Sequence, residues 1–96
     1  MGQLLYGSPP VVFEFDDRAL AHIELVTLAK LRRNEHFAFS IDSADGAGRT
    51  TIWIGVSIPL QFQFSSSRHE INRVWLDELL DSANSTAGMR YTRETP

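Results

Sequence analysis

Three neighbouring stretches of this chain, FAFSID (residues 37–42), TIWIGVS (51–57) and LQFQFS (60–65), alternate apolar with polar or small side chains. A period of two matches the pleat of a β-strand, in which successive side chains point to opposite faces. The apolar positions of each stretch fall on one face. The pattern therefore predicts an antiparallel three-strand meander with one apolar and one polar face.

Trp53 is a large aromatic residue on the predicted polar face. Its expected neighbours there are Ser40, Gln61 and Gln63, and a large ring among such side chains is typical of a surface that meets a partner or stacks on a ligand. We expect an interaction surface of Trp53 with these three residues, and a second copy of the chain as the partner. Stacking on a small ligand or nucleic acid, and cover by a loop or the C-terminal tail, are the alternatives.

The segment before the meander predicts a hairpin followed by a helix. Short strand candidates at 4–6 and 11–15 flank the turn sequence GSPP. A helix is expected from Asp16 or Asp17, whose carboxylates suit a helix start, to about Arg33. Its apolar residues cover more than one narrow stripe, which predicts burial on more than one side.

The segment after the meander predicts a second helix and a last strand. The sequence SRHE at 67–70 fits a capping box, with a helix behind it to about residue 83. A short strand is expected at 89–92 and a frayed tail at 93–96. The complete prediction is a single α+β domain over residues 1–96. It has an antiparallel sheet of five or six strands, the chain order β-β-α-β-β-β-α-β, and both helices on the apolar face.

Composition narrows the classes of protein that this chain can represent. It has 96 residues, a net charge of −3 and no cysteine, which excludes disulfides and thiolate metal sites. No basic start precedes a long apolar stretch, and no apolar run approaches the roughly 18 residues of a membrane helix. We therefore expect a cytoplasmic protein without membrane contact. The negative charge argues against general electrostatic attraction to nucleic acid.

Motifs for catalysis or metal binding are weak throughout the sequence. The loop at 42–49 lacks the ligand spacing of a calcium loop and the Gly-x-x-x-x-Gly-Lys pattern of a phosphate loop. His22, His36 and His69 are isolated, and no serine lies in a nucleophile elbow. His22 with Lys30 and Arg33 would line one side of the first helix, where we expect a solvated face, with a strip that attracts anions as the alternative. We expect no catalytic residue, no cofactor and no metal site.

Segments along nearly the whole chain carry a family resemblance: LYG (5–7), FDDRALAH (15–22), AKLRR (29–33), GRTTIW (48–53), IPL (58–60) and NRVW (72–75). The chain resembles a small family of uncharacterised actinobacterial proteins of about this length, many of which carry the label ATP-dependent DNA ligase. A ligase of that class attaches AMP to the lysine of Lys-x-Asp-Gly. The single lysine here, Lys30, is followed by Leu-Arg-Arg, so the resemblance supplies no catalytic residue.

Two functions follow as expectations. The first is a non-catalytic interaction module that self-associates, with a homodimer as the expected assembly. The alternative is a nucleic-acid-binding accessory protein linked to DNA repair or ligation. That protein would contact phosphates through Lys30, Arg32, Arg33 and Arg49 and stack bases on Trp53.

Overall fold

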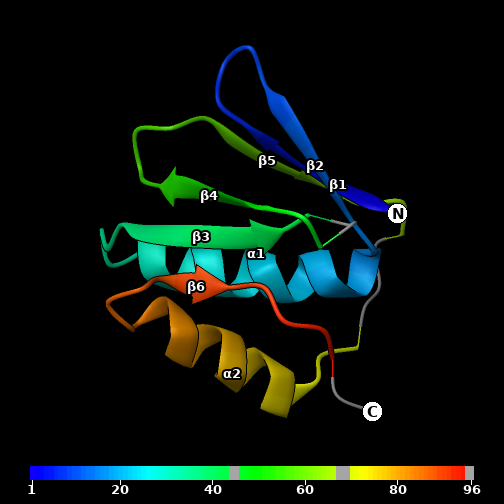
Figure 1. Cartoon of the computed structure of the whole chain (residues 1–96), viewed down its shortest axis with the longest axis vertical. Helices are drawn as coiled ribbons and strands as arrows, with labels where there is room; N and C mark the ends of the chain where they lie inside the picture. Colours follow the sequence, from blue (N-terminus) through cyan, green and yellow to red (C-terminus); the bar gives the residue numbers. More distant parts are fainter. Residues whose placement is uncertain (44–45, 67–69, 95–96) are drawn as a thin grey trace.

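The computed structural model describes residues 1–43, 46–66 and 70–94. It confirms the mixed α+β class and the predicted chain order, with two helices and six strands (Figure 1). The elements are β1 (Gly2–Tyr6), β2 (Val11–Phe15), α1 (Asp17–Leu31), β3 (Phe37–Asp42), β4 (Arg49–Ile54), β5 (Leu60–Gln63), α2 (Arg73–Ala83) and β6 (Met89–Arg90).

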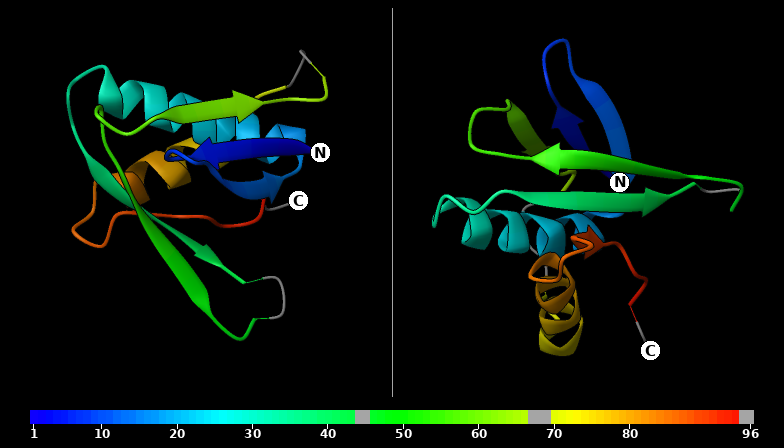
Figure 2. Two further views of the ribbon diagram at one scale, coloured as in Figure 1. Left: turned by 90° about the horizontal axis from the view of Figure 1, so that it is seen from above. Right: turned by 60° about the vertical axis from the view of Figure 1, so that its left-hand side comes forward.

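The strands form two sheets of three rather than one sheet of five or six. One sheet has the order β2-β1-β5 with antiparallel neighbours, and the other has the order β4-β3-β6, in which β6 runs parallel to β3 (Figure 2). The β3–β4 hairpin is present as predicted, with Phe37 opposite Ile54 and Asp42 opposite Arg49. The predicted pairing of the fifth strand with the fourth is wrong, because β5 pairs with β1.

Strand β5 does not extend the predicted meander, because it pairs with the free edge of β1 instead. After residues 55–59, β5 pairs along β1 with Tyr6 opposite Leu60, and the Gly7 N–H donates to the Pro59 carbonyl at 2.9 Å. Alternation identifies which face of a strand is apolar, but it does not identify which strand lies alongside. The predicted face holds for Phe62, which is partly buried against the core.

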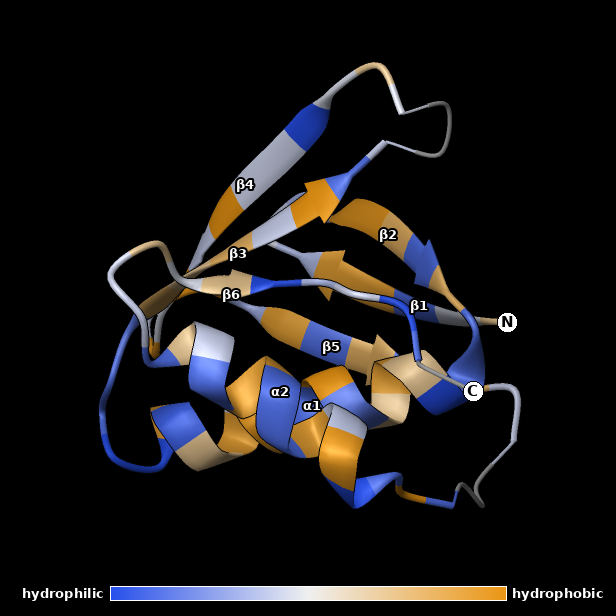
Figure 3. Cartoon of the chain, turned by 60° about the horizontal axis from the view of Figure 1, so that its bottom comes forward, coloured by the Kyte–Doolittle hydropathy of each residue, from blue (hydrophilic) through white to orange (hydrophobic). Residues whose placement is uncertain are grey.

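The core lies between the sheets and the two helices. In Figures 1 and 3, α1 lies against the sheets and α2 lies on the same side farther out. Apolar residues of both helices, among them Leu20, Ile23 and Leu79, belong to the buried core. Helix α1 is buried on more than one side, as predicted, with eight buried residues. Val56 is 53% exposed, contrary to its predicted inward position, because the strand ends at Ile54. The largest fully buried side chains are Phe39, Leu4, Leu20, Ile23, Ile54, Leu79, Met89, His22 and Val26.

Helix boundaries follow local capping. Asp16 is the N-cap of α1, and its side chain accepts from the Ala19 N–H at 2.8 Å, as predicted. The helix ends at Leu31, two residues early, and Asn34 adopts φ 59°, the left-handed conformation typical of a helix stop. Helix α2 begins at Arg73 with Asn72 as N-cap, not at the predicted box, whose residues 67–69 lie outside the described residues.

Candidate functional site

Trp53 lies on the outward face of β4, at the edge of its sheet, and is 56% exposed. Its Cα partner on β3 is Ala38. Its backbone carbonyl accepts from the Tyr6 hydroxyl at 2.8 Å, which joins the two sheets at this point. The His36 ring lies with its centroid 6.2 Å from that of Trp53. The residue is therefore held by its backbone while its indole faces solvent.

The predicted neighbours of Trp53 do not share its surface in the way expected. Ser40 is buried at 8% exposure and hydrogen-bonds Thr51 Oγ1 at 2.9 Å. Gln61 and Gln63 are exposed, but they belong to β5 in the other sheet and hydrogen-bond each other at 3.3 Å. The cause is the β5–β1 pairing, which removes β5 from the edge of β4.

A small hollow lies beside Trp53 instead. Its volume is about 150 Å³, and its walls come from the start of β3, from Trp53 and from the segment after α2. An engineered cavity of about this volume holds one benzene molecule. We call Trp53, His36 and this hollow the Trp53 surface. The hollow is lined by His36, Phe37, Ala38, Trp53, Ala83, Ser85, Thr86 and Gly88.

The predicted phosphate-contacting cations are not gathered in one place. Lys30 is buried at 9% exposure, donates to Asn84 Oδ1 at 2.7 Å and pairs with Glu35 at 3.2 Å. Arg32 and Arg33 are exposed just after α1, before β3 begins, whereas Arg49 lies opposite the last residue of β3. A strand of this length spans about 17 Å. Lys30 is therefore part of the helix–helix contact, and the arginines are divided between the two ends of β3.

A polar cluster that sequence reasoning missed joins the start of both helices to the C-terminal segment. Arg18 Nε and Nη2 donate to the two oxygens of Glu94, each at 2.8 Å, and Arg18 Nη1 donates to the Glu70 carbonyl. Asn72 caps α2 through its oxygen and donates from Nδ2 to Glu94 Oε2 at 2.7 Å. We call these four residues the Arg18 cluster. It holds Glu94, which lies in the segment expected to fray.

The charge and hydrogen bonds of this cluster act on the Glu94 carboxyl. The hydrogen bonds from Arg18 and then from Asn72 lower the pKa of Glu94 to about 2. The same hydrogen-bonded pair raises the pKa of Arg18. Glu94 therefore remains ionised in the folded protein well below the ordinary range of a carboxyl.

His22 is fully buried beside the cluster, contrary to the solvated helix face expected for it. Its Nε2 accepts from the Asn72 N–H at 2.9 Å, so the ring proton is on Nδ1, which donates to the Arg18 carbonyl at 2.7 Å. The ring also packs against Trp75, with centroids 4.4 Å apart. His22 is thus a structural residue that connects α1 to the start of α2.

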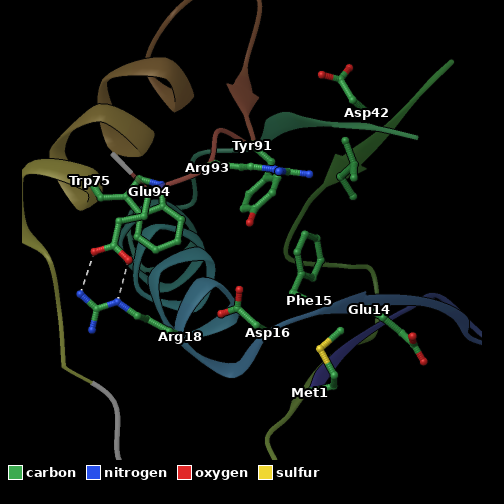
Figure 4. A pocket seen from close by; sticks show the side chains of 11 residues that line it. Met1, Glu14, Phe15, Asp16, Arg18, Asp42, Trp75, Tyr91, Arg93 and Glu94 are labelled. Carbon is green, nitrogen blue, oxygen red and sulfur yellow. Dashed lines mark hydrogen bonds and ion pairs between the residues drawn. The ribbon is translucent and has the colours of Figure 1, made fainter. Parts of the chain in front are cut away.

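An open cavity of about 630 Å³ lies between the start of α1 and the C-terminal segment (Figure 4). Phe15 and Trp75 are buried in its floor and Tyr91 forms a half-buried wall. Burial and the nearby Asp16 carboxylate raise the pKa of Tyr91. The volume of the cavity lies in the range of small-molecule binding sites.

The described part of the chain offers few other sites. Among its residues, no group of three or more His, Asp or Glu side chains is placed to hold a metal ion. No helix in the described ranges is both long and apolar enough to cross a membrane.

Comparisons with known proteins give a family but no activity. A model for a domain of unknown function, DUF7882, matches residues 1–94. The comparison with curated proteins and the comparison with solved structures each gave no match.

Proposed function

The chain belongs to the DUF7882 family of domains of unknown function. We propose that it is a non-catalytic interaction module that self-associates through the Trp53 surface. The observation that carries the proposal is the exposure of Trp53, 56%, on an edge strand beside a hollow of about 150 Å³. Tryptophan is strongly enriched among the residues that dominate binding energy at interfaces.

The gain from covering this residue is large for a single side chain. A tryptophan with 56% exposure leaves about 140 Å² open, and burying that area contributes about 3 kcal/mol per copy. In a dimer with two-fold symmetry the same patch occurs on both copies, so each copy offers one indole and one ring-sized hollow. The two indoles together can offset much of the cost of association.

Side-chain docking fits this surface better than strand addition. The Tyr6 hydroxyl already occupies the Trp53 carbonyl at the C-terminal end of β4, so a partner strand would have to compete for that acceptor. His36 beside Trp53 supplies a second ring at the rim. The proposed interface is therefore an aromatic contact with a polar surround.

Light scattering after size-exclusion chromatography tests the proposal over a concentration series up to about 1 mM. Wild type is expected to be a dimer, and Trp53→Ala is expected to weaken association at least ~100-fold, while the far-UV circular dichroism and the melting temperature stay near those of wild type. The matched control is Val74→Ala, which truncates a 67% exposed apolar residue on α2. A monomeric wild type throughout the series, or equal weakening by both variants, contradicts the proposal.

A second candidate is a nucleic-acid-binding accessory protein linked to DNA repair or ligation. The observation that favours it is the pair of His36 and Trp53 rings, with Arg32 and Arg33 only a few residues before His36. This function predicts salt-sensitive binding of single-stranded or nicked DNA that both Trp53→Ala and the double change Arg32→Gln/Arg33→Gln weaken. Absence of binding at about 50 mM salt excludes it.

A further inference from the structure

We propose that the 630 Å³ cavity beside α1 binds a small organic ammonium compound that carries one aromatic or similarly sized apolar ring. This site is separate from the Trp53 surface, and none of its lining residues belongs to that surface. The proposal therefore does not depend on the proposed function. It rests on the shape of the cavity, its aromatic walls and the distribution of charge around it.

Aromatic side chains form the floor and one wall of the cavity. Phe15 and Tyr91 meet edge to face, with ring centroids 5.3 Å apart and planes at 68°, and Trp75 adds an indole from α2. Trp75 Nε1 is already bonded to the Thr92 carbonyl at 2.8 Å, so its ring contributes apolar surface rather than a donor. Aromatic faces attract cations and pack against apolar rings.

The acidic residues around the cavity are not equivalent. Glu94 is held by Arg18 and Asn72, and Asp42 pairs with Arg90 at 3.6 Å. Asp16 uses Oδ1 to cap α1, and no residue within 1–43, 46–66 and 70–94 hydrogen-bonds its other oxygen. Its carboxylate thus offers an acceptor at the cavity.

The geometry in Figure 4 brings this acceptor together with a hydroxyl. The Asp16 carboxylate and the Tyr91 hydroxyl point into the same space, whereas the Glu14 side chain points away from it. An ammonium group fits there because it can donate to both oxygens, while the attached ring lies against Tyr91 and the small exposed part of Phe15. An anionic group in that position would face the Asp16 carboxylate. Two arginines also line the cavity. The charge of Arg93 acts on Tyr91, and Arg18 lies near Asp16 but has its guanidinium hydrogen-bonded to Glu94.

Tryptophan fluorescence tests the proposal directly. The chain has two tryptophans, so a Trp53→Phe background leaves Trp75, in the cavity floor, as the single reporter. The probe is 2-phenylethylammonium, and its neutral analogue 2-phenylethanol is the matched ligand control. The amine is expected to give a saturable change with Kd on the order of 1 mM, and the alcohol is expected to bind at least ~10-fold more weakly.

Two substitutions in the full chain locate the binding. Asp16→Asn keeps an N-cap oxygen for α1 but removes the charge, and it is expected to weaken binding of the amine about 10-fold without lowering the melting temperature by more than a few degrees. Asp42→Asn removes a carboxylate that is already paired with Arg90, and it is expected to change Kd less than about 2-fold. Equal binding of amine and alcohol, no saturation up to about 10 mM, or equal effects of the two substitutions overturns the proposal.

Discussion

Replacing the buried His22 tests the connection between the two helices most directly. In His22→Leu the side-chain volume is roughly kept, but the acceptor for the Asn72 N–H and the donor to the Arg18 carbonyl are both lost. His22→Gln keeps a polar side chain whose amide oxygen can accept in place of Nε2. The difference between these variants isolates the value of that acceptor.

The magnitude follows from what each change leaves unpaired. The Asn72 N–H lies at the first turn of α2, where no intrahelical partner exists, so removing its acceptor costs about 1–3 kcal/mol. The lost bond to the Arg18 carbonyl adds about 1 kcal/mol, and loss of the ring contact with Trp75 about 0.5–1.5 kcal/mol. His22→Leu is thus expected to destabilise the protein by about 2.5–5.5 kcal/mol, and His22→Gln by about 1–3 kcal/mol less than that because it keeps the acceptor.

Urea unfolding followed by far-UV circular dichroism measures the free energies of unfolding of both variants. For a chain of this size, His22→Leu should lower the melting temperature by at least ~10 °C. Amide hydrogen exchange adds a local readout, because the Asn72 N–H should lose protection in the Leu variant and regain part of it in the Gln variant. If His22→Leu is as stable as wild type, or if the Gln variant is the less stable of the two, the assigned hydrogen bonds do not support α2.

Three further predictions concern the C-terminal segment and the ends of the helices. Because the folded pKa of Glu94 is lowered from 4.5 to about 2, its stabilising pair is complete above about pH 4.5 and is lost as the pH falls toward 2. Acid unfolding of Glu94→Gln should therefore lack part of the wild-type loss of stability in that window, and identical profiles would refute the pairing. Gly88→Ala should lower the free energy of unfolding by more than about 1 kcal/mol, because Gly88 has φ +85° and the new Cβ would lie 2.5 Å from the oxygen of a backbone carbonyl. Gly7→Ala, at φ +81° but with open space around the new Cβ, should cost about 1 kcal/mol. Equal losses in chemical unfolding would contradict the steric argument. Lys30→Met keeps the buried stem but removes the bond to Asn84, so thermal unfolding should show a loss of about 1 kcal/mol, and an unchanged melting temperature would count against this contact.

Local patterns in the sequence predict much of this fold. Alternation identifies the inward faces of β3 and β4, the Asp16 carboxylate marks the start of α1, and the same alternation predicts that Trp53 faces outward. These features depend on residues within a few positions of each other. Period-two alternation and helix capping are local properties, so one sequence is enough to recognise them.

The features that the sequence does not predict depend on distant partners. The β5–β1 pairing depends on a free edge that forms far away in the chain, and Lys30 turns inward because Asn84 lies beside it in the folded protein. Helix α2 begins later than predicted because Asn72 can cap the helix and also hydrogen-bond Glu94. A capping pattern at 67–70 identifies a possible start, but competition between possible starts is decided by tertiary contacts.

The first turn of α1 holds distant parts of the chain, and this has a consequence for the order of folding. Asp17 Oδ2 accepts from Ser65 Oγ across 48 residues, and Arg18 pairs with Glu94 across 76 residues. Contacts of such separation close large loops, so we expect them to form after the rate-limiting step. Weakening them would then accelerate unfolding and leave the refolding rate almost unchanged.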